Sequence, residues 1–218
     1  MTKPELTQEQ ELGQLRQDID LIDQQIQSLI NQRATCAQRV AEVKQLHQGS
    51  QDAVFYRPER EAQVLRNVME RNEGPLGDEE MARLFRELMS ACLAHEQPMK
   101  VAFLGPEGTF TQAAALKHFG HSVISAPLSS IDEVFREVEA KRAHYGVVPI
   151  ENSSEGMVNN TLDSFRHSSL VISGEVEMRI HQNLLVKSGS DLSQIECIYS
   201  HSQSLAQCRS WLDNHMPH

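Results

Sequence analysis

The feature that most constrains this chain is one long helical pattern close to its start. From Leu12 to Leu46, apolar residues recur at intervals of three and four positions, and no proline interrupts them. At a rise of about 1.5 Å per residue, a helix of this length extends roughly 50 Å, which is longer than a domain of this size is wide. The stripe consists of residues 12, 15, 19, 22, 26, 29, 30, 37, 40 and 43. The fold must cover it along its whole length.

Two shorter helical patterns follow. One helix is predicted to start at Pro58, because proline suits a first helical turn, and another to start with Asp78 as its N-cap. Two short helices cannot cover the long stripe within one chain, whereas a second copy of the chain can. We therefore expect an all-α domain of three helices that forms an intertwined homodimer. The inward positions of the two short helices are Val64, Leu65, Val68 and Met69, and Met81, Leu84, Phe85, Leu88, Cys92 and Leu93.

The periodicity changes after Gln97-Pro98. Short runs of β-branched residues then alternate with helical patterns, which is typical of βαβ units and a parallel sheet. We expect two domains, a helical one over residues 1–97 and an α/β one over residues 98–218. The predicted strands are 101–104, 122–125, 145–150, 170–186 (one long or two joined strands) and 197–200. The predicted helices start at Thr111, span 131–142, and start near Ser202 or Ser204.

Charge and composition exclude several classes of function. The 218 residues carry a formal net charge of -10, which argues against nucleic acid as a partner because phosphate neutralisation needs a basic face. No apolar run approaches the roughly 20 residues of a membrane span, and the polar start does not resemble a signal peptide. We expect a cytoplasmic protein. The four cysteines and ten histidines show no metal-ligand spacing, so we expect reduced thiols, no metal and no cofactor.

The spacing of several cations of the helical domain gives their relative directions around the helix axis. Arg33 and Lys44 are eleven residues apart, so they lie within about 20° of each other on one helix face. Arg16 points about 100° away, so it would serve the pocket of a partner chain in a dimer. Each of these side chains has the alternative reading of a solvated surface charge.

Charged residues also mark the starts and ends of the shorter helices. Arg57 and Arg60 offer guanidinium forks for carboxylates at the start of the second helix, where Glu61 complements the helix dipole. The alternative is a solvated helix start. Glu96 prolongs the apolar stripe of Leu88 and Cys92, so its carboxyl group lies either in solvent at the helix end or in a pocket.

The residues of the α/β domain carry weaker signals when taken alone. The glycines of Gly105-x-x-Gly108 lack the lysine of a P-loop and the spacing of a dinucleotide site. They indicate only that backbone amides near Thr109, at a helix start, can hold a carboxylate. Asn152 and Ser153 are equally typical of a plain turn.

The helical domain resembles the all-helical chorismate mutases. The similar segments are Leu-Arg-Gln-Asp-Ile-Asp-Leu-Ile-Asp23, Asn-Gln-Arg33 with Val-Lys44, and Tyr-Arg-Pro-Glu-Arg-Glu61. The resemblance implies a dianionic substrate and an intramolecular rearrangement, which needs a compact substrate and hydrogen bonds to its ether oxygen. It implies Lys44, Glu96 and Arg60 as catalytic residues. The implied substrate-binding residues are Arg16 (from the partner chain), Arg33, Lys44, Arg57, Arg60, Glu61, Cys92 and Glu96.

Two positions depart from the pattern of that family. Cys92 stands where the family commonly has serine, which weakens one hydroxyl contact. Glu96 stands where glutamine is frequent, and only a protonated carboxyl can donate the hydrogen bond that an amide donates. Burial is expected to raise the pKa of Glu96, with Lys44 opposing the shift.

The α/β domain resembles prephenate dehydratase. The similar segments are Phe-Leu-Gly105-Pro-Glu-Gly-Thr-Phe, Val-Val-Pro-Ile-Glu-Asn152-Ser-Ser-Glu-Gly156 and Tyr-Ser200-His-Ser-Gln-Ser-Leu-Ala-Gln207. The resemblance implies a doubly wound, two-lobed α/β fold like that of periplasmic binding proteins. The prephenate contacts that it implies are Glu107, Thr109, Phe110, Asn152, Ser153, Ser200 and Gln207, of which Asn152, Ser200 and Gln207 are the firmest.

The two resemblances in this order are those of the bifunctional chorismate mutase/prephenate dehydratases of phenylalanine biosynthesis. The family's Thr-Arg-Phe motif and its C-terminal ACT domain are absent from the 218 residues, so we expect a truncated chain with an impaired dehydratase step. The alternative is a dimeric sensor that binds a small carboxylate without catalysis. The cations of residues 55–61 favour the enzyme, because a dimerisation helix has no use for them.

Overall fold

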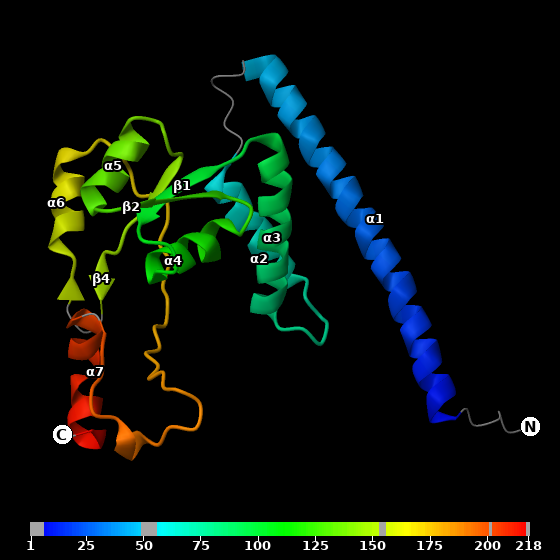
Figure 1. Ribbon diagram of the computed structural model, residues 1–218. Coiled ribbons are helices and arrows are strands. Elements are labelled where there is room, and N and C mark those ends of the chain that lie inside the picture. The colour runs from blue at the N-terminus through cyan, green and yellow to red at the C-terminus, as the bar shows by residue number, and fades with distance from the viewer. Residues whose placement is uncertain (1–6, 49–55, 153–155, 201, 217–218) are drawn as a thin grey trace, which may run out of the picture.

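The computed structural model describes residues 7–48, 56–152, 156–200 and 202–216. The helical part comprises α1 (Gln8–Gln48), α2 (Pro58–Glu70) and α3 (Asp78–Glu96). Figure 1 shows α1 as a long rod whose N-terminal end reaches away from the other elements. Leu65 and Val68 of α2 and Ala82 and Cys92 of α3 are buried. The long helix and the helix start at Pro58 are as predicted.

The start of α3 differs from the prediction. Gly77, with an extended backbone, occupies the N-cap position, and Asp78 is the first helical residue. The Asp78 carboxylate instead accepts a hydrogen bond of 2.8 Å from the Asn72 side-chain amide, which closes the turn between α2 and α3. The prediction that Asp78 caps the helix was therefore wrong by one position.

A parallel sheet forms the centre of the α/β part. Its strands are β1 (Lys100–Leu104), β2 (Ile124–Leu128) and β3 (Tyr145–Val147), in the order β2-β1-β3. The helices α4 (Phe110–Phe119) and α5 (Ile131–Glu139) cover opposite faces. Val101 packs with α4, whereas its neighbour Ala102 packs with Val134 of α5, as expected for side chains that alternate along a strand. The predicted parallel sheet with helices on both faces is confirmed.

Tertiary contacts shift the edges of the strands. The Ser122 N–H donates to the Ser90 hydroxyl oxygen, so this residue is not available to the sheet and β2 begins at Ile124 rather than at residue 122. β3 stops at Val147, two residues before Pro149, which has no N–H to offer to a neighbouring strand. Lys141 has a φ of 57°, and α5 accordingly ends at Glu139.

Beyond the sheet lie β4 (Glu151–Asn152), β5 (Gly156–Met157) and α6 (Asn159–His167). The two short strands pair in antiparallel fashion. The fully buried Thr161 donates its hydroxyl to the Pro149 carbonyl oxygen at 2.6 Å, and the rings of Phe135 and Phe165 meet edge to face at 4.9 Å. These contacts fix α6 beside α5.

The predicted strands at 170–186 and 197–200 are wrong. In the described part of this region, residues 168–200 form no strand and contain only a single 3-10 turn, Leu192–Gln194, before α7 (Ser202–His215). A strand needs a neighbour for its backbone N–H and C=O groups, and this segment pairs with none of the described strands. Val171, Leu185 and Tyr199 are accordingly 85%, 89% and 91% exposed.

The helical part packs against the α/β part along α3. The His121 backbone N–H donates to the Glu87 carboxylate at 3.0 Å, and the His121 ring lies 2.7 Å from the same carboxylate. Gly120 has a φ of 78° and lies directly against the Ser90 side chain. No helix among the described residues is both long and apolar enough to cross a membrane.

Candidate functional site

Four predicted site residues come together between α1 and α3. The Arg33 guanidinium donates to the Cys92 sulfur at 3.1 Å, and Cys92 is 5% exposed. Glu96 lies one helical turn after Cys92, within electrostatic reach of both Lys44 and Arg33. The structure therefore brings the cationic face of α1 onto the Cys92 and Glu96 face of α3. We call this set, Arg33, Lys44, Cys92 and Glu96, the α1–α3 cluster.

The carboxyl group of this cluster has a shifted pKa. Burial raises the pKa of Glu96 above its ordinary value, and the positive charges of Lys44 and Arg33 oppose that rise. The direction agrees with the expectation from the sequence. A protonated carboxyl is a hydrogen-bond donor, whereas an ionised carboxylate accepts only. The cluster thus offers two cations and one titratable donor to a small anionic ligand.

Three predicted arginines lie outside the cluster in the single chain. Arg16 is exposed and lies seventeen residues before Arg33, which is about 25 Å along the helix. Arg57 and Arg60 are exposed at the start of α2, where the Arg60 guanidinium donates to the Gln63 side-chain oxygen at 2.9 Å. All three guanidinium groups are therefore accessible from solvent.

Glu61 faces the junction with the α/β part. Its carboxylate lies 3.7 Å from the Arg86 guanidinium and hydrogen-bonds with the Tyr56 hydroxyl. Burial raises the pKa of Glu61, and Arg86 and Tyr56 oppose this shift. The sequence analysis identified neither Tyr56 nor Arg86. One sequence signal could have identified Arg86. The three- and four-residue spacing of Arg86, Ser90 and Leu93 puts this arginine on the face of α3 that meets the α/β part.

In the α/β part, three predicted residues lie between the end of β1 and the first turn of α4. Thr109 is the N-cap of α4: its hydroxyl oxygen accepts from the Gln112 N–H at 3.4 Å, and the hydroxyl donates to the Pro106 carbonyl oxygen at 2.9 Å. Glu107 and Phe110 are exposed on either side of it. The carboxyl end of a central parallel strand, followed by a helix start, is a favourable position for an anion.

The remaining predicted dehydratase residues are spread over three elements. Asn152 lies in β4 opposite Gly156 of β5. Ser200 is exposed just before α7, and Gln207 of α7 accepts a hydrogen bond of 3.1 Å from Gln182. Ser153 lies outside the described residues. Among the described elements, α7 does not pack extensively against the sheet or its helices, so these residues do not form one enclosed site with the loop after β1.

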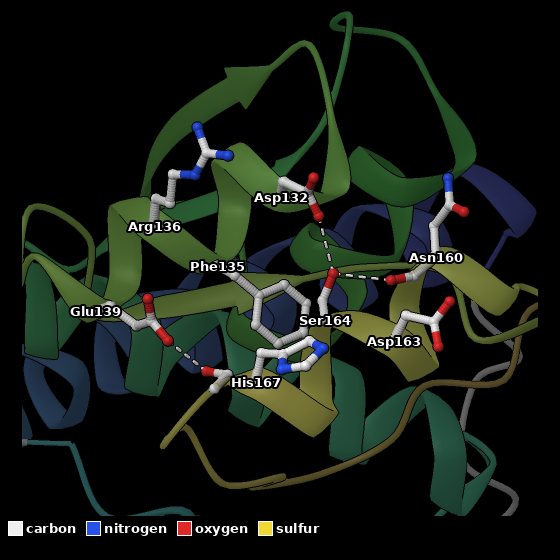
Figure 2. Close-up of a pocket in the computed structure, with 9 residues that line it drawn as sticks. Asp132, Phe135, Arg136, Glu139, Asn160, Asp163, Ser164 and His167 are labelled. Carbon is white, nitrogen blue, oxygen red and sulfur yellow. Dashed lines mark hydrogen bonds between the residues drawn. The ribbon is translucent and has the colours of Figure 1, made fainter.

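A hollow of about 420 Å³ lies elsewhere, between α5 and α6 (Figure 2). Ser164 stands at its centre, where its hydroxyl is hydrogen-bonded to the Asp132 carboxylate and to the Asn160 carbonyl oxygen. None of the predicted site residues lines it. The lining residues are Asp132, Phe135, Arg136, Glu139, Asn160, Asp163, Ser164, His167 and Ser168.

Comparison with known protein families now places the chain. The family described as prephenate dehydratase matches residues 101–218, and the family described as chorismate mutase type II matches residues 15–97. The chain belongs to the prephenate dehydratase family. The two matches in this order agree with the predicted likeness to the bifunctional chorismate mutase/prephenate dehydratases.

Individual relatives give the same result. The chain is 62% identical to a bifunctional chorismate mutase/prephenate dehydratase of Stutzerimonas stutzeri, over 97% of this chain and 58% of the relative. It is 61% identical to the protein of that name from Pseudomonas aeruginosa, with the same coverage, and 32% identical to the one from Escherichia coli K12, over 98% and 58%. The chain thus spans about 58% of the length of these curated relatives.

A solved structure is also similar in sequence. It is a prephenate dehydratase from Arthrobacter aurescens in complex with L-Phe, with 36% identity, a TM-score of 0.39, and coverage of 55% of this chain and 40% of that one.

Proposed function

We propose that this chain rearranges chorismate to prephenate in a helical domain of residues 1–97, and that residues 98–218 form a dehydratase domain for the step from prephenate to phenylpyruvate in phenylalanine biosynthesis. The observation that carries the mutase proposal is the α1–α3 cluster, in which two cations, a buried thiol and a carboxyl with a raised pKa meet between two helices. The names of the relatives support it. No cofactor is required, and we propose a cytoplasmic location.

The α1–α3 cluster suits a rearrangement within one molecule. No bond to the protein forms, so the site needs only to hold the dianion in a compact shape and to stabilise charge on its ether oxygen. Arg33 would bind a substrate carboxylate, and Arg57 and Arg60 would supply further cations from the start of α2. Lys44 and protonated Glu96 would each donate a hydrogen bond to the ether oxygen.

The exposed stripe of α1 supports a homodimer as the working unit. Ile19 and Leu29 are 56% and 62% exposed, and the stripe continues through most of the 41-residue helix. Exposed apolar area of this extent is typical of a surface that another chain covers. About 25 Å of helix separates Arg16 from the α1–α3 cluster of its own chain. In such a dimer, Arg16 would instead reach the α1–α3 cluster of the partner chain.

We propose that residues 1–218 alone carry out the dehydratase step slowly. Ser200 and Gln207 lie on a segment that forms no strand with the sheet, so they do not close over the loop after β1 or over Asn152. Misplacement of substrate contacts by as little as about 1 Å can cost roughly 10²-fold in rate.

A product-resolved assay with chorismate tests the proposal. The chain should consume chorismate and accumulate prephenate rather than phenylpyruvate. Arg33→Ala should lower kcat/KM by roughly 10²-fold, because the substrate loses a preorganised cation, whereas Arg39→Ala, at an exposed position on the same helix, should not. A folded dimer that consumes no chorismate would favour the carboxylate sensor. Rapid phenylpyruvate formation would contradict the proposed impairment.

A further inference from the structure

Three aromatic rings join the helical part to the α/β part. Tyr56, two residues before the start of α2, packs against Phe119 of α4 with 5.7 Å between ring centroids and against Tyr145 of β3 with 5.3 Å. Phe119 and Tyr145 in turn lie 5.1 Å apart. We call this trio the aromatic clasp. It continues the hydrophobic core that includes Met99 and Val101, so the start of α2 is anchored in the core of the other domain.

The clasp is connected to the first turn of α2 by polar contacts. The Tyr56 hydroxyl hydrogen-bonds with Glu61, whose side chain is 17% exposed and lies 3.7 Å from the Arg86 guanidinium. Burial raises the pKa of Tyr56, so this hydroxyl keeps its proton and remains a donor at neutral pH. The carboxylate of Glu61 thus has a donor from the clasp on one side and a cation from α3 on the other.

These contacts hold a helix start that has no side-chain cap. Arg57 occupies the N-cap position without a side-chain hydrogen bond to the first turn, and its carbonyl oxygen accepts from the N–H groups of Arg60 and Glu61. A short helix without a side-chain cap frays at its start. Tyr56 of the clasp precedes the first turn of α2, and Glu61 ends it, so contacts at both residues hold this turn in place. Arg57 and Arg60 lie between them.

We infer that Tyr56, Phe119 and Tyr145 act as positioning residues for the mutase reaction, because they fix the helix start that presents Arg57 and Arg60 to the substrate. The α/β domain therefore contributes to a site whose reacting groups all belong to the helical domain. This inference rests on the proposed mutase function. It assigns the three rings to the reaction through their effect on α2, not through contact with the substrate.

A positioning role has a kinetic signature. Arg57 and Arg60 would bind substrate carboxylates that carry their charge in both the ground state and the transition state, so misplacing them removes uniform binding. KM for chorismate should then rise, while kcat, which depends on Lys44 and Glu96, should stay nearly constant. Loss of packing alone would lower the melting temperature and leave KM unchanged at temperatures where the protein is folded.

The experiment uses the whole chain. Tyr145→Leu should raise KM for chorismate roughly 10-fold or more through misplacement of the cations, with kcat within about twofold of its original value. Tyr145→Phe keeps the ring and should retain the original KM. The matched control is Tyr199→Leu, at a tyrosine of the same domain that is 91% exposed, and it should change neither constant. If Tyr145→Leu does not fold, Tyr56→Leu is measured in its place.

Hydrogen exchange gives a second readout that does not need activity. Amides of residues 57–64 should exchange faster in Tyr145→Leu than in the original chain or in Tyr199→Leu. An original chain without mutase activity would refute the proposed function, and the exchange data would then decide alone whether the clasp orders α2. Unchanged exchange, or an unchanged KM in a folded and active Tyr145→Leu variant, would overturn the inference.

Discussion

The central strand β1 and the helix α1 are both rich in apolar residues, yet they differ in what covers them. Val101, Ala102 and Phe103 of β1 are at most 1% exposed, because α4 and α5 cover the two faces of the sheet within the same chain. Along α1, by contrast, residues such as Ile19 and Leu29 remain more than half exposed. The α/β part completes this section of its core alone, whereas the helical part has an apolar surface that its own chain does not cover.

The largest expected effect concerns the uncovered surface. Ile19→Asp places a charge on the stripe and should cost about 3 to 6 kcal/mol per dimer, since each of two copies loses a buried apolar side chain. The dissociation constant should rise roughly 100-fold or more. Analytical ultracentrifugation over a concentration series measures it.

Leu21 provides the matched control. It lies two residues from Ile19 and is equally exposed, at 57% against 56%, but it points about 130° from the centre of the stripe. Leu21→Asp should leave self-association unchanged. Equal effects of the two substitutions would show that the stripe is not the interface.

The next effect concerns the covered strand. Phe103→Ala removes a ring that is 0% exposed and should lower the free energy of unfolding by about 3 to 5 kcal/mol. Phe110→Ala, at a ring that is 49% exposed, should cost less than about 1 kcal/mol. Urea denaturation of the two variants at one protein concentration tests this contrast, and similar midpoints would argue against an autonomous sheet core.

A smaller effect is expected where the two parts meet. Gly120 has φ 78° and ψ 177°, a conformation that essentially only glycine adopts, and a Cβ there would overlap the Ser90 side chain. Gly120→Ala should therefore destabilise the protein by about 1 to 3 kcal/mol or more. Gly13→Ala, where a Cβ meets nothing within 4 Å, should instead stabilise α1 by about 0.5 to 1 kcal/mol. Thermal unfolding of both variants should show these opposite signs.

The smallest change is the replacement of one carboxyl by an amide. Because burial raises the pKa of Glu96 and the protonated form is the donor, mutase kcat/KM should fall as pH rises through that raised pKa, by about tenfold per pH unit above it. Glu96→Gln donates at every pH and should remove this decline, while Glu42→Gln, at an exposed position, should keep it. If the original protein and Glu96→Gln decline alike with rising pH, the titrating group lies elsewhere.

Much of the fold was predictable because it depends on local periodicity. The three-four spacing of α1, the proline at the start of α2 and the β-branched run of β1 each report a structure formed by neighbouring residues. The same regularity placed Arg33 and Lys44 on one face of α1, and Cys92 and Glu96 on one face of α3. What it could not show is that the two faces meet, which the contact between Arg33 and Cys92 establishes.

The tertiary structure decided the features that depend on partners distant in the chain. Residues 170–186 have a strand-like composition but form no strand, because backbone hydrogen bonds need a neighbouring strand that the described chain does not place there. The prediction of Glu61 as a substrate ligand could not include its contacts with Tyr56 and Arg86, because the clasp with Phe119 and Tyr145 sets where the start of α2 lies. A periodic pattern records which face of an element is apolar, whereas the identity of the group opposite that face is set by the path of the whole chain.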